Sequence, residues 1–484
     1  MKNLTQRIRS IGHRALIWTL TWLAAAATAQ AQIVVNSTSD GNVIAPPWEP
    51  PPPPVCTLRD AITAANENRV VNGCVKGNPG RDTILFNIGT GTPTIRIRSR
   101  LPIIKEPVVI RGDTFGATRV ELDGSAASQF NVFGQVTHGL YLTGGDSTIR
   151  NLVINRFSGN GIVFADPSSP TLPDPTPPSL PDRSIWPEDG IVDPDISELD
   201  GAGGKNAVYG CFIGTDATGT IALGNGSGDN TAGIIVGTYS NTIGGSSAAD
   251  RNVISGNRGH GIILAGKGNW VRGNFIGLDV TGKLPLGNQF DGINVINPPS
   301  GQPPSANGVI GANPNPADAA CGIVKDPVTG YIWDDRKQCG NRIAFNNGSG
   351  IAGGFNLFTF MANSIYSNGF LGIDVDLLGV SPNMLNRQRN FPVLTSWRPE
   401  FSTSGAVSTR VFGSINPSGK VVQFFHSPTC DPSNYGEGQT YLASYSVSGN
   451  GSFAVLLPVT GGYITATSTN GLVSTSEFSA CLKI

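Results

Sequence analysis

Short apolar runs separated by Gly and Asn recur along residues 200–380. Each run is three to five residues long and rich in β-branched side chains, as in Gly261-Ile-Ile-Leu264 and Gly372-Ile-Asp-Val375. Alternating β-branched residues between Gly and Asn predict short strands. No stretch of this part of the sequence has the 3.6-residue periodicity of a long amphipathic helix.

The runs belong to a repeat. Residues 206–219 return as residues 269–282, and both copies read Asn-x-Val-x-Gly-x-Phe-Ile-Gly-x-Asp-x-Thr-Gly. A shorter period lies inside this one, because Asn252 and Asn274 are 22 residues apart, as are Asn341 and Asn363. Short strands at a fixed period are typical of a solenoid. We therefore predict an all-β parallel β-helix with coils of about 22 residues, stacked about 4.8 Å apart.

Asparagine suits the bends of such a coil, because it tolerates the left-handed conformation and its amides can stack in ladders. We expect Asn252 and Asn274 to occupy the same bend of successive coils. Cys211 stands where the second copy has Asn274, so we expect it to fill that bend as a small buried group. Asn225 is expected in a Gly-rich outer loop.

The two ends of the chain differ from this repeat. Residues 1–31 have a basic start, an apolar run and Ala29-Gln-Ala31, which is the pattern of a signal peptide. Residues 32–90 contain a helical spacing over 58–68, with Leu58, Ile62 and Ala65 on one side, and predict an α/β cap for the end of the solenoid 91–390. In 391–484 about seven short alternating segments predict an immunoglobulin-like β-sandwich.

Two loop insertions are expected within the solenoid, at 165–204 and 297–338. Both are rich in Pro, and the first has too few apolar residues to bury a core. The second carries Trp333. Loops that leave a solenoid often carry specificity.

Composition and charge narrow the class of protein. Charged residues make up only 14% of the chain and the formal net charge is −1, which gives no reason to expect nucleic acid as a partner. We expect a monomer that is secreted or displayed on the cell surface, with no transmembrane segment in the mature chain.

Export implies an oxidising compartment, in which the seven cysteines can pair. Local bracketing predicts three bridges and leaves Cys211 free. The predicted pairs are Cys56 with Cys74, Cys321 with Cys339, and Cys430 with Cys481.

The segment Cys56-Thr-Leu-Arg-Asp-Ala-Ile-Thr-Ala-Ala-Asn66 resembles the Cys-Ser-Leu-Arg-Glu-Ala motif of the CSLREA-domain proteins. Thr57 and Asp60 depart from that motif conservatively. Similar segments follow in order, among them 149–157, 251–257 and the end, Ser476-Glu-Phe-Ser-Ala-Cys481. The resemblance implies an exported bacterial right-handed parallel β-helix with a pectate-lyase-like fold, and it implies a fold more than a function.

Candidate catalytic residues are few. β-Helices similar to pectate lyases hold Ca²⁺ with a cluster of Asp and take a proton with a nearby Arg or Lys. The candidates for this chemistry are Asp374 and Asp376, which could share a metal ion, together with Asp291, Arg251 and His260. Lys267 and Arg272 are further candidate bases. Asp216 and Asp279 recur at one turn of two coils, which favours a structural role, and His260 in a Gly-Ile coil pattern is expected at the surface.

Two functions follow from these observations. The first is a non-catalytic β-helix protein that binds polysaccharide or another surface ligand along its stacked sheets. The second is a carbohydrate-active enzyme, either a calcium-dependent polysaccharide lyase or a glycoside hydrolase. Convergence of carboxylates and a base in one groove would distinguish the second from the first.

Overall fold

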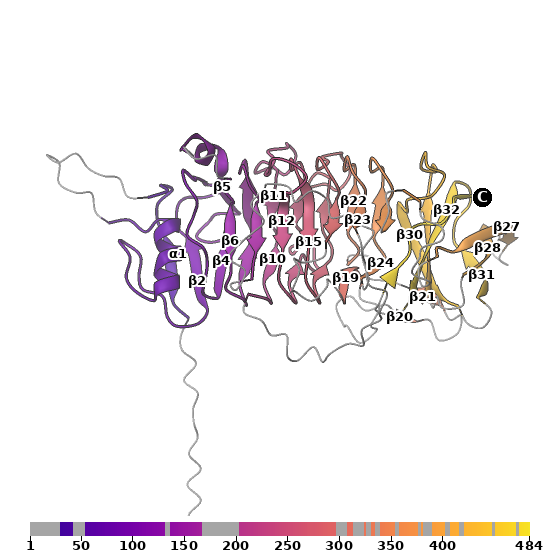
Figure 1. Ribbon diagram of the computed structural model, residues 1–484, viewed down its shortest axis with the longest axis horizontal. Helices are drawn as coiled ribbons and strands as arrows, with labels where there is room; N and C mark the ends of the chain where they lie inside the picture. Colours follow the sequence, from indigo (N-terminus) through magenta and orange to yellow (C-terminus); the bar gives the residue numbers. More distant parts are fainter. Residues whose placement is uncertain are drawn as a thin grey trace, which may run out of the picture.

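The computed structural model describes residues 30–41, 54–130, 136–166, 203–296, 307–312, 324–325, 331–333, 339–353, 358–375, 379–380, 390–401, 407–415, 421–447, 451–470 and 474–484. The molecule is elongated, with a helix at its N-terminal end, strands crossing its long axis and a block of antiparallel strands at its C-terminal end (Figure 1). It is a right-handed parallel β-helix closed by a β-sandwich, as the sequence predicts.

Three parallel sheets form the β-helix, and each coil contributes at most one strand to each sheet. In order, the first sheet contains β1 (Gln32–Val35), β2 (Asp82–Phe86), β4 (Val108–Arg111), β7 (Thr148–Arg150), β10 (Ala207–Tyr209), β13 (Thr242–Ile243), β16 (Trp270–Val271), β19 (Gly308–Gly311) and β24 (Phe358–Met361). The second contains β3 (Thr94–Arg96), β5 (Val120–Asp123), β8 (Leu152–Asn155), β11 (Phe212–Ile213), β14 (Val253–Ile254), β17 (Phe275–Ile276), β22 (Arg342–Ala344) and β25 (Ser364–Tyr366). The third contains β6 (Leu140–Leu142), β9 (Ile162–Phe164), β12 (Ala232–Val236), β15 (His260–Leu264), β18 (Ile293–Val295), β23 (Ile351–Gly353) and β26 (Ile373–Val375).

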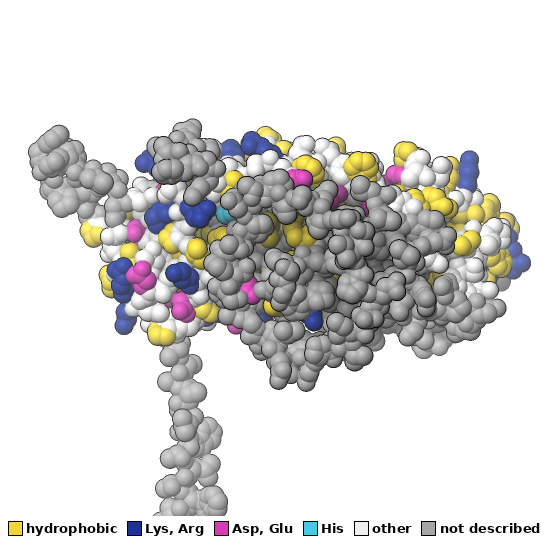
Figure 2. All heavy atoms as spheres, viewed as in Figure 1, with side chains coloured by type: hydrophobic (Ala, Val, Ile, Leu, Met, Phe, Trp, Pro, Cys, Tyr) yellow, Lys and Arg dark blue, Asp and Glu magenta, His cyan; other side chains and the backbone are white. Residues whose placement is uncertain are grey.

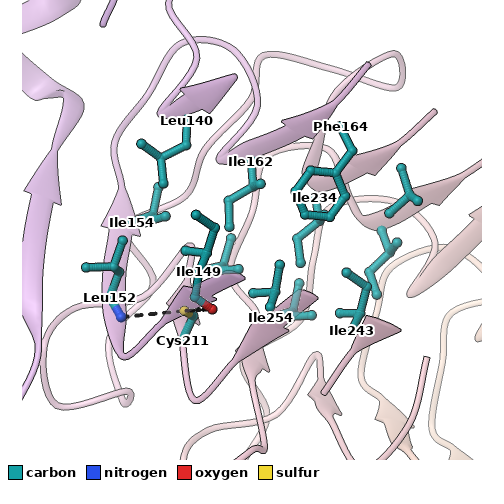
Figure 3. Packing of buried hydrophobic residues seen from close by; sticks show 14 of the residues in the cluster. Leu140, Ile149, Leu152, Ile154, Ile162, Phe164, Cys211, Ile234, Ile243 and Ile254 are labelled. Atoms are coloured by element: carbon teal, nitrogen blue, oxygen red, sulfur yellow. Dashed lines mark hydrogen bonds between the residues drawn. The ribbon is translucent and has the colours of Figure 1, made fainter. Parts of the chain in front are cut away.

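Apolar side chains of the same kind stack above one another inside the β-helix (Figure 3). In the second sheet Ile154 pairs with Ile213, and Ile213 pairs with Ile254 in the next coil. All three side chains are fully buried. Burial of an Ile side chain contributes roughly 1.5–3 kcal/mol. The stacked isoleucines therefore stabilise the contact between successive coils.

Buried asparagines mark the bends between the sheets and form ladders from coil to coil. One ladder precedes the second sheet and contains Cys211, Asn252, Asn274, Asn341 and Asn363. This confirms that Asn252 and Asn274 share a bend and that Cys211 fills the same position. Two further ladders contain Asn206, Asn241 and Asn269, and Asn225, Asn257, Asn288, Asn346 and Asn368.

The expected outer-loop position of Asn225 is wrong. Its side chain is fully buried and begins the ladder that follows the second sheet. Its Nδ2 donates to the carbonyl of Ile154 at 2.9 Å and to Oδ1 of Asn257 at 3.1 Å. The surrounding glycines belong to the bend itself, because a Cβ on Gly224 would lie 2.4 Å from the carbonyl oxygen of Gly256.

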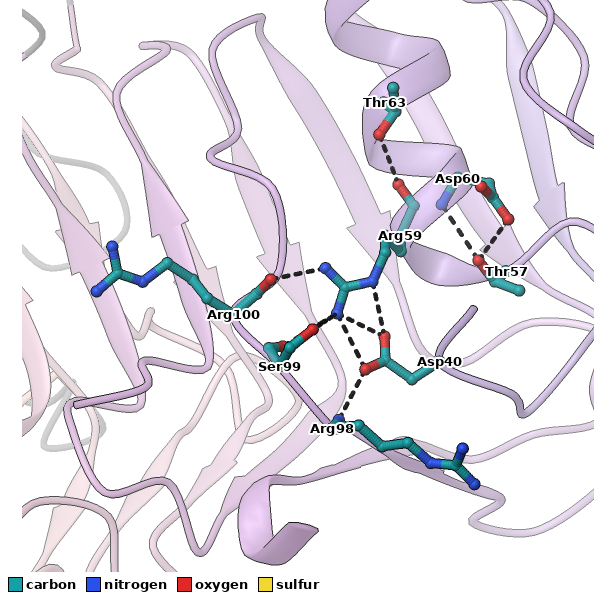
Figure 4. Close-up of polar contacts among 8 residues, drawn as sticks. All are labelled: Asp40, Thr57, Arg59, Asp60, Thr63, Arg98, Ser99 and Arg100. Carbon is teal, nitrogen blue, oxygen red and sulfur yellow. Dashed lines mark hydrogen bonds and ion pairs between the residues drawn. The ribbon is translucent and has the colours of Figure 1, made fainter. Parts of the chain in front are cut away.

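The N-terminal helix α1 (Leu58–Glu67) covers the open end of the β-helix and buries Leu58, Ile62 and Ala65, as predicted. Thr57 caps it by accepting the N–H of Asp60, as at many helix N-termini. Arg59 fixes the helix to its surroundings (Figure 4): it pairs with the buried Asp40 at 2.9 Å and donates to the carbonyl of Arg100 at 2.6 Å. The Cys56–Cys74 disulfide closes the same segment.

The cap and the β-helix share a sheet. Strands β1 and β2, from the segment expected to form a separate cap, are the first two strands of the first sheet. The 3₁₀ helix η1 (Gly124–Phe130) follows β5.

The C-terminal domain is a β-sandwich. One sheet has the order β20 (Val324–Lys325), β21 (Tyr331–Trp333), β30 (Thr440–Ser446), β29 (Val421–Ser427), β32 (Tyr463–Asn470) and β33 (Ser474–Thr475), with β34 (Leu482–Lys483) also pairing with β32. The other contains β27 (Val393–Phe401), β28 (Val407–Ser414) and β31 (Ser452–Leu457). The Cys430–Cys481 disulfide confirms the predicted pairing and joins the segment after β29 to the segment before β34.

This domain satisfies the hydrogen bonds that the last coil leaves open. Gln423 accepts the N–H of Ala362 and donates to the carbonyl of Phe360 at the end of the first sheet. Gly438 exchanges two backbone hydrogen bonds with Ile365 at the end of the second. Open strand edges invite pairing with other chains. The sandwich therefore acts as the C-terminal cap.

The second expected insertion is not a loop throughout. Gly308–Gly311 forms β19, a regular strand of the first sheet that pairs with β16 and β24. Strands β20 and β21 from the same range extend the sandwich, where Tyr331 pairs with Tyr445. The short Gly-Val-Ile-Gly run gave too weak a signal to separate this coil from the Pro-rich sequence around it. The first insertion lies almost wholly outside the described residues.

Cys211 is a free, buried cysteine, as predicted. Cys339 is disulfide-bonded. Its predicted partner, Cys321, lies outside the described residues, as does the predicted signal peptide through residue 29.

Candidate functional site

Asp216 and Asp279 hold the two repeated loops in shape, as predicted. Oδ1 of Asp279 accepts the backbone N–H of Lys283 at 3.1 Å and of Leu284 at 3.0 Å. Asp216 makes the equivalent bonds in its own loop. These hydrogen bonds and those from the neighbouring threonines lower the pKa of both carboxyl groups, against the opposing effect of burial.

The expected surface position of His260 is wrong, because its side chain is almost fully buried at the start of β15. Its Nδ1 lies 3.1 Å from the backbone N of Asp291 and accepts that N–H. Its Nε2 lies 2.8 Å from the carbonyl oxygen of Asp229. Both ring nitrogens are thus within hydrogen-bond distance of backbone groups, and Nε2 also lies 3.3 Å from Nδ2 of Asn294.

His260 belongs to a column of side chains in the third sheet, each two residues before an inward aliphatic residue such as Leu140 or Ile262. His138 in an earlier coil accepts the backbone N–H of Asn160 at 2.9 Å in the same way. Asp291 continues the column, because its Oδ1 accepts the N–H of Ser349 at 2.7 Å. The column satisfies backbone donors from one coil to the next. The structure therefore brings His260 and Asp291 together, with 3.3 Å between Nδ1 and Oδ2.

Asp374 lies on β26 and is buried. Its Oδ1 accepts the N–H of Gly379 at 3.3 Å, and its Oδ2 lies 3.4 Å from the hydroxyl of Ser349. Asp376 lies outside the described residues. Within the described ranges no group of three His, Cys, Asp or Glu side chains is arranged to hold a metal ion.

The two candidate arginines lie on other faces of the β-helix than Asp374. Arg251 donates through Nε to the carbonyl of Gly273, and its guanidinium lies 4.3 Å from the ring centroid of Phe275 on the outer face of the second sheet. Arg272 stacks on Trp270 of the first sheet. Asp374, in contrast, lies on the third sheet. Arg251 and Arg272 therefore do not converge with Asp374.

A groove lies on the outer face of the first sheet and is lined by residues that the sequence did not single out. Its volume is about 560 Å³, within the range of natural ligand clefts. Strands β4 and β7 form its base, since Val109 pairs with Thr148 and Arg111 pairs with Arg150. The lining residues are Arg81, Val109, Arg111, Asp113, Arg119, Thr148, Arg150, Asn151, Ala248 and Ala249.

Arginines dominate the groove. Arg111 donates to both carboxylate oxygens of Asp113, and Arg150 pairs with Asp250 at 2.8 Å. Figure 2 shows that Lys and Arg side chains also gather toward the N-terminal end on the face drawn there. The signal in the sequence is faint, because the four arginines come from three different coils and their turns.

The comparisons with known proteins add little to this description. No family model matches the chain, and no curated protein matches it. Among solved structures it is similar to the full-length tailspike protein 2 from Escherichia coli O157:H7 bacteriophage CAB120, at 11% identity over 81% of this chain and 57% of that chain, with a TM-score of 0.14. A second is the enzymatically active domain of Bacteriophage CBA120 tailspike protein 4, at 10% identity over 88% of this chain and 66% of that chain, with a TM-score of 0.17.

This chain thus spans less than two thirds of each of those tailspike chains. At such TM-scores the likeness carries no argument, and the fold rests on the strand pairing of the chain itself.

Proposed function

We propose that this is an exported β-helix protein of the cell surface or medium that binds polysaccharide without cleaving it. The observation that carries the proposal is the groove on the first sheet, which combines a ligand-sized volume with side chains that donate hydrogen bonds. Clefts with a few convergent polar groups are the usual binding sites of proteins. The groove lies on the outer face of a long sheet, which suits a segment of a long polymer.

Binding without catalysis agrees with the hydrogen bonds that the candidate acid and base groups make. His260, Asp291 and Asp374 hydrogen-bond to backbone or hydroxyl groups of neighbouring coils. General acid–base catalysis needs a group within hydrogen-bond reach of the substrate. These three side chains are occupied in holding coils together.

Export and family membership are parts of the same proposal. The Cys56–Cys74 and Cys430–Cys481 disulfides support an oxidising compartment. In the described part of the chain, no helix is both long and apolar enough to cross a membrane. We propose that the protein is a monomer. We also propose that it is of the CSLREA-domain type, because Arg59 of the motif-like segment fixes the cap helix.

Binding and cleavage can be measured on the same samples. The purified mature protein is incubated with acidic and neutral polysaccharides, with and without Ca²⁺. We expect co-sedimentation or affinity electrophoresis to show binding to at least one polymer. We also expect no new reducing ends and no unsaturated products.

Cleavage that depends on Ca²⁺ and is lost in Asp374→Asn would contradict the proposal and establish the lyase instead. Binding to no polymer at all would contradict the proposal outright.

A further inference from the structure

The four arginines of the groove differ in how their charges are balanced. Arg111 faces Asp113, and Arg150 faces Asp250. Arg81 and Arg119 have no carboxylate within ion-pairing distance among the residues that the structure describes. The groove therefore contains two arginines whose charge is paired and two whose charge is not.

Neutral groups hold the two unpaired arginines in place. The Nη2 of Arg81 donates to Oγ1 of Thr148 at 2.6 Å. The guanidinium of Arg119 lies 3.8 Å from the ring centroid of Phe212, and its Nε donates to the carbonyl of Gly210 at 3.1 Å. Such contacts fix a guanidinium without neutralising it. Their remaining N–H groups are thus oriented before a ligand arrives.

The charge of the site follows from this count. Four arginines contribute +4, and Asp113 and Asp250 contribute −2, which leaves +2 for the groove and its immediate ion-pair partners. The whole chain, in contrast, has a formal net charge of −1. The groove is therefore positively charged although the chain as a whole is not. Burial lowers the pKa of the Arg119 guanidinium, so a bound anion would replace hydration that this group has lost.

The rest of the lining suits a sugar ring. Thr148 and Asn151 provide neutral polar side chains. Val109, Ala248 and Ala249 provide small apolar side chains. Guanidinium groups recognise carboxylates and sulfates through paired N–H bonds. We propose that the groove binds an anionic glycan segment, with carboxylate or sulfate groups on Arg81 and Arg119. This inference rests on the proposed function and names the class of polysaccharide.

Matched ligands test the charge requirement. An oligogalacturonide is compared with its methyl ester, and dextran sulfate with dextran, by calorimetry on the full mature chain. The first pair tests a carboxylate source and the second a sulfate source. We expect at least one acidic member to bind about tenfold more tightly than its neutral partner, since a hydrogen bond to a charged group is worth at least about that factor.

Matched variants test the site. Arg81→Gln and Arg119→Gln should each weaken binding of the acidic ligand about tenfold. Arg258→Gln removes the same charge from an exposed position in another bend and should leave binding unchanged. If Arg119→Gln unfolds because it leaves Phe212, the exposed Arg81→Gln still decides the question.

Three other results would contradict the proposal in different ways. Equal binding of acidic and neutral ligands, unaffected by either variant, would overturn the anionic groove and leave polysaccharide binding intact. Inorganic phosphate binding as tightly as the acidic oligosaccharide would overturn the glycan class. Binding to no glycan would overturn the proposed function together with this inference.

Discussion

A single ladder asparagine satisfies its whole side-chain amide inside the protein. Oδ1 of Asn274 accepts the backbone N–H and the Nδ2–H of Asn252, at 3.3 and 3.0 Å. Its Nδ2 donates to the carbonyl of Ile243 at 2.9 Å and to Oδ1 of Asn341 at 3.0 Å. An amide has two N–H donors and one oxygen that can accept twice. The amide of Asn274 therefore leaves none of its hydrogen-bonding groups unused.

Truncation of a ladder asparagine should strand buried polar groups in two coils. We expect Asn274→Ala and Asn225→Ala each to lower the free energy of unfolding by roughly 1–3 kcal/mol. Asn347 is the matched control, because it lies next to the ladder residue Asn346 but is exposed and bonds only to Gln289 through its side chain. Denaturant melts of the mature protein measure all three. A loss at Asn347 as large as at Asn274 would refute the ladder account.

At the scale of the element, the ladder that precedes the second sheet has a thiol instead of an amide at its N-terminal end. Its first member is Cys211, whose Sγ lies 3.5 Å from the backbone N of Leu152 and 3.9 Å from the carbonyl oxygen of Ile149 (Figure 3). In the next coil Asn252 makes the equivalent contacts to Cys211 and Val208 at 2.9 Å each. A thiol is a weak donor and a weak acceptor. Sγ also lies closer, at 3.3 Å, to the carbonyl oxygen of Tyr209. The contacts of the thiol with Leu152 and Ile149 are therefore weak where an amide would make two ordinary hydrogen bonds.

Cys211→Asn should extend the ladder by one rung. The new Oδ1 would accept the N–H of Leu152 and the new Nδ2 would donate to the carbonyl of Ile149. We expect the free energy of unfolding to rise by about 1 kcal/mol relative to the natural chain. Cys211→Ala removes the side-chain bonds and should lower it. The same melts rank the three proteins, and an Asn variant no more stable than the Ala variant would mean that this bend has no room for an amide.

At the scale of the whole molecule, Glu437 joins the sandwich to the β-helix. Its Oε1 accepts the backbone N–H and the Nδ2–H of Asn368, each at 3.0 Å, and its Oε2 accepts the N–H of Ser367. The carboxyl group thus takes the place that the next asparagine of the ladder would fill. Burial raises its pKa to about 7, although the bonds from Asn368 act in the opposite direction.

This raised pKa makes the joint sensitive to pH. The folded protein holds a proton on Glu437 up to about pH 7, while the unfolded chain loses it near its ordinary value of 4.5. Stability from this group is therefore present below about pH 4.5 and is lost as the pH rises to about 7. The loss is roughly 3 kcal/mol. His138 acts in the opposite sense, because burial lowers its pKa to about 4.

The readout is therefore the difference between the natural chain and Glu437→Gln, measured by denaturant melts from pH 5 to pH 8. We expect the variant to be less stable at pH 5, because an amide cannot serve as the acceptor for both Ser367 and Asn368. We expect this deficit to shrink toward pH 7. Glu400→Gln is the control, since Arg410 holds the pKa of Glu400 at about 2 and its charge is constant over this range. A deficit that does not change with pH would contradict the raised pKa.

Much of the architecture could be predicted from the sequence because it depends on local repetition. The spacing of Asn252 and Asn274 gave the coil length, and the inward isoleucine of each coil gave the strands. Cysteines that bracket short segments gave the Cys56–Cys74 and Cys430–Cys481 bridges. Each of these features is set by neighbours within one or two coils, so a period in the sequence is enough to show it.

The site depends on contacts that have no period. The groove assembles Arg81, Arg111, Arg119 and Arg150 from separate coils and turns, and only the register of the first sheet places them side by side. The roles of Asn225 and His260 were hidden for a related reason, since burial at a bend depends on the coil that packs next to it. The sequence by itself determined the repeat and the caps that end it. Only the tertiary structure decided which polar residues hold coils together and which face outward to meet a ligand.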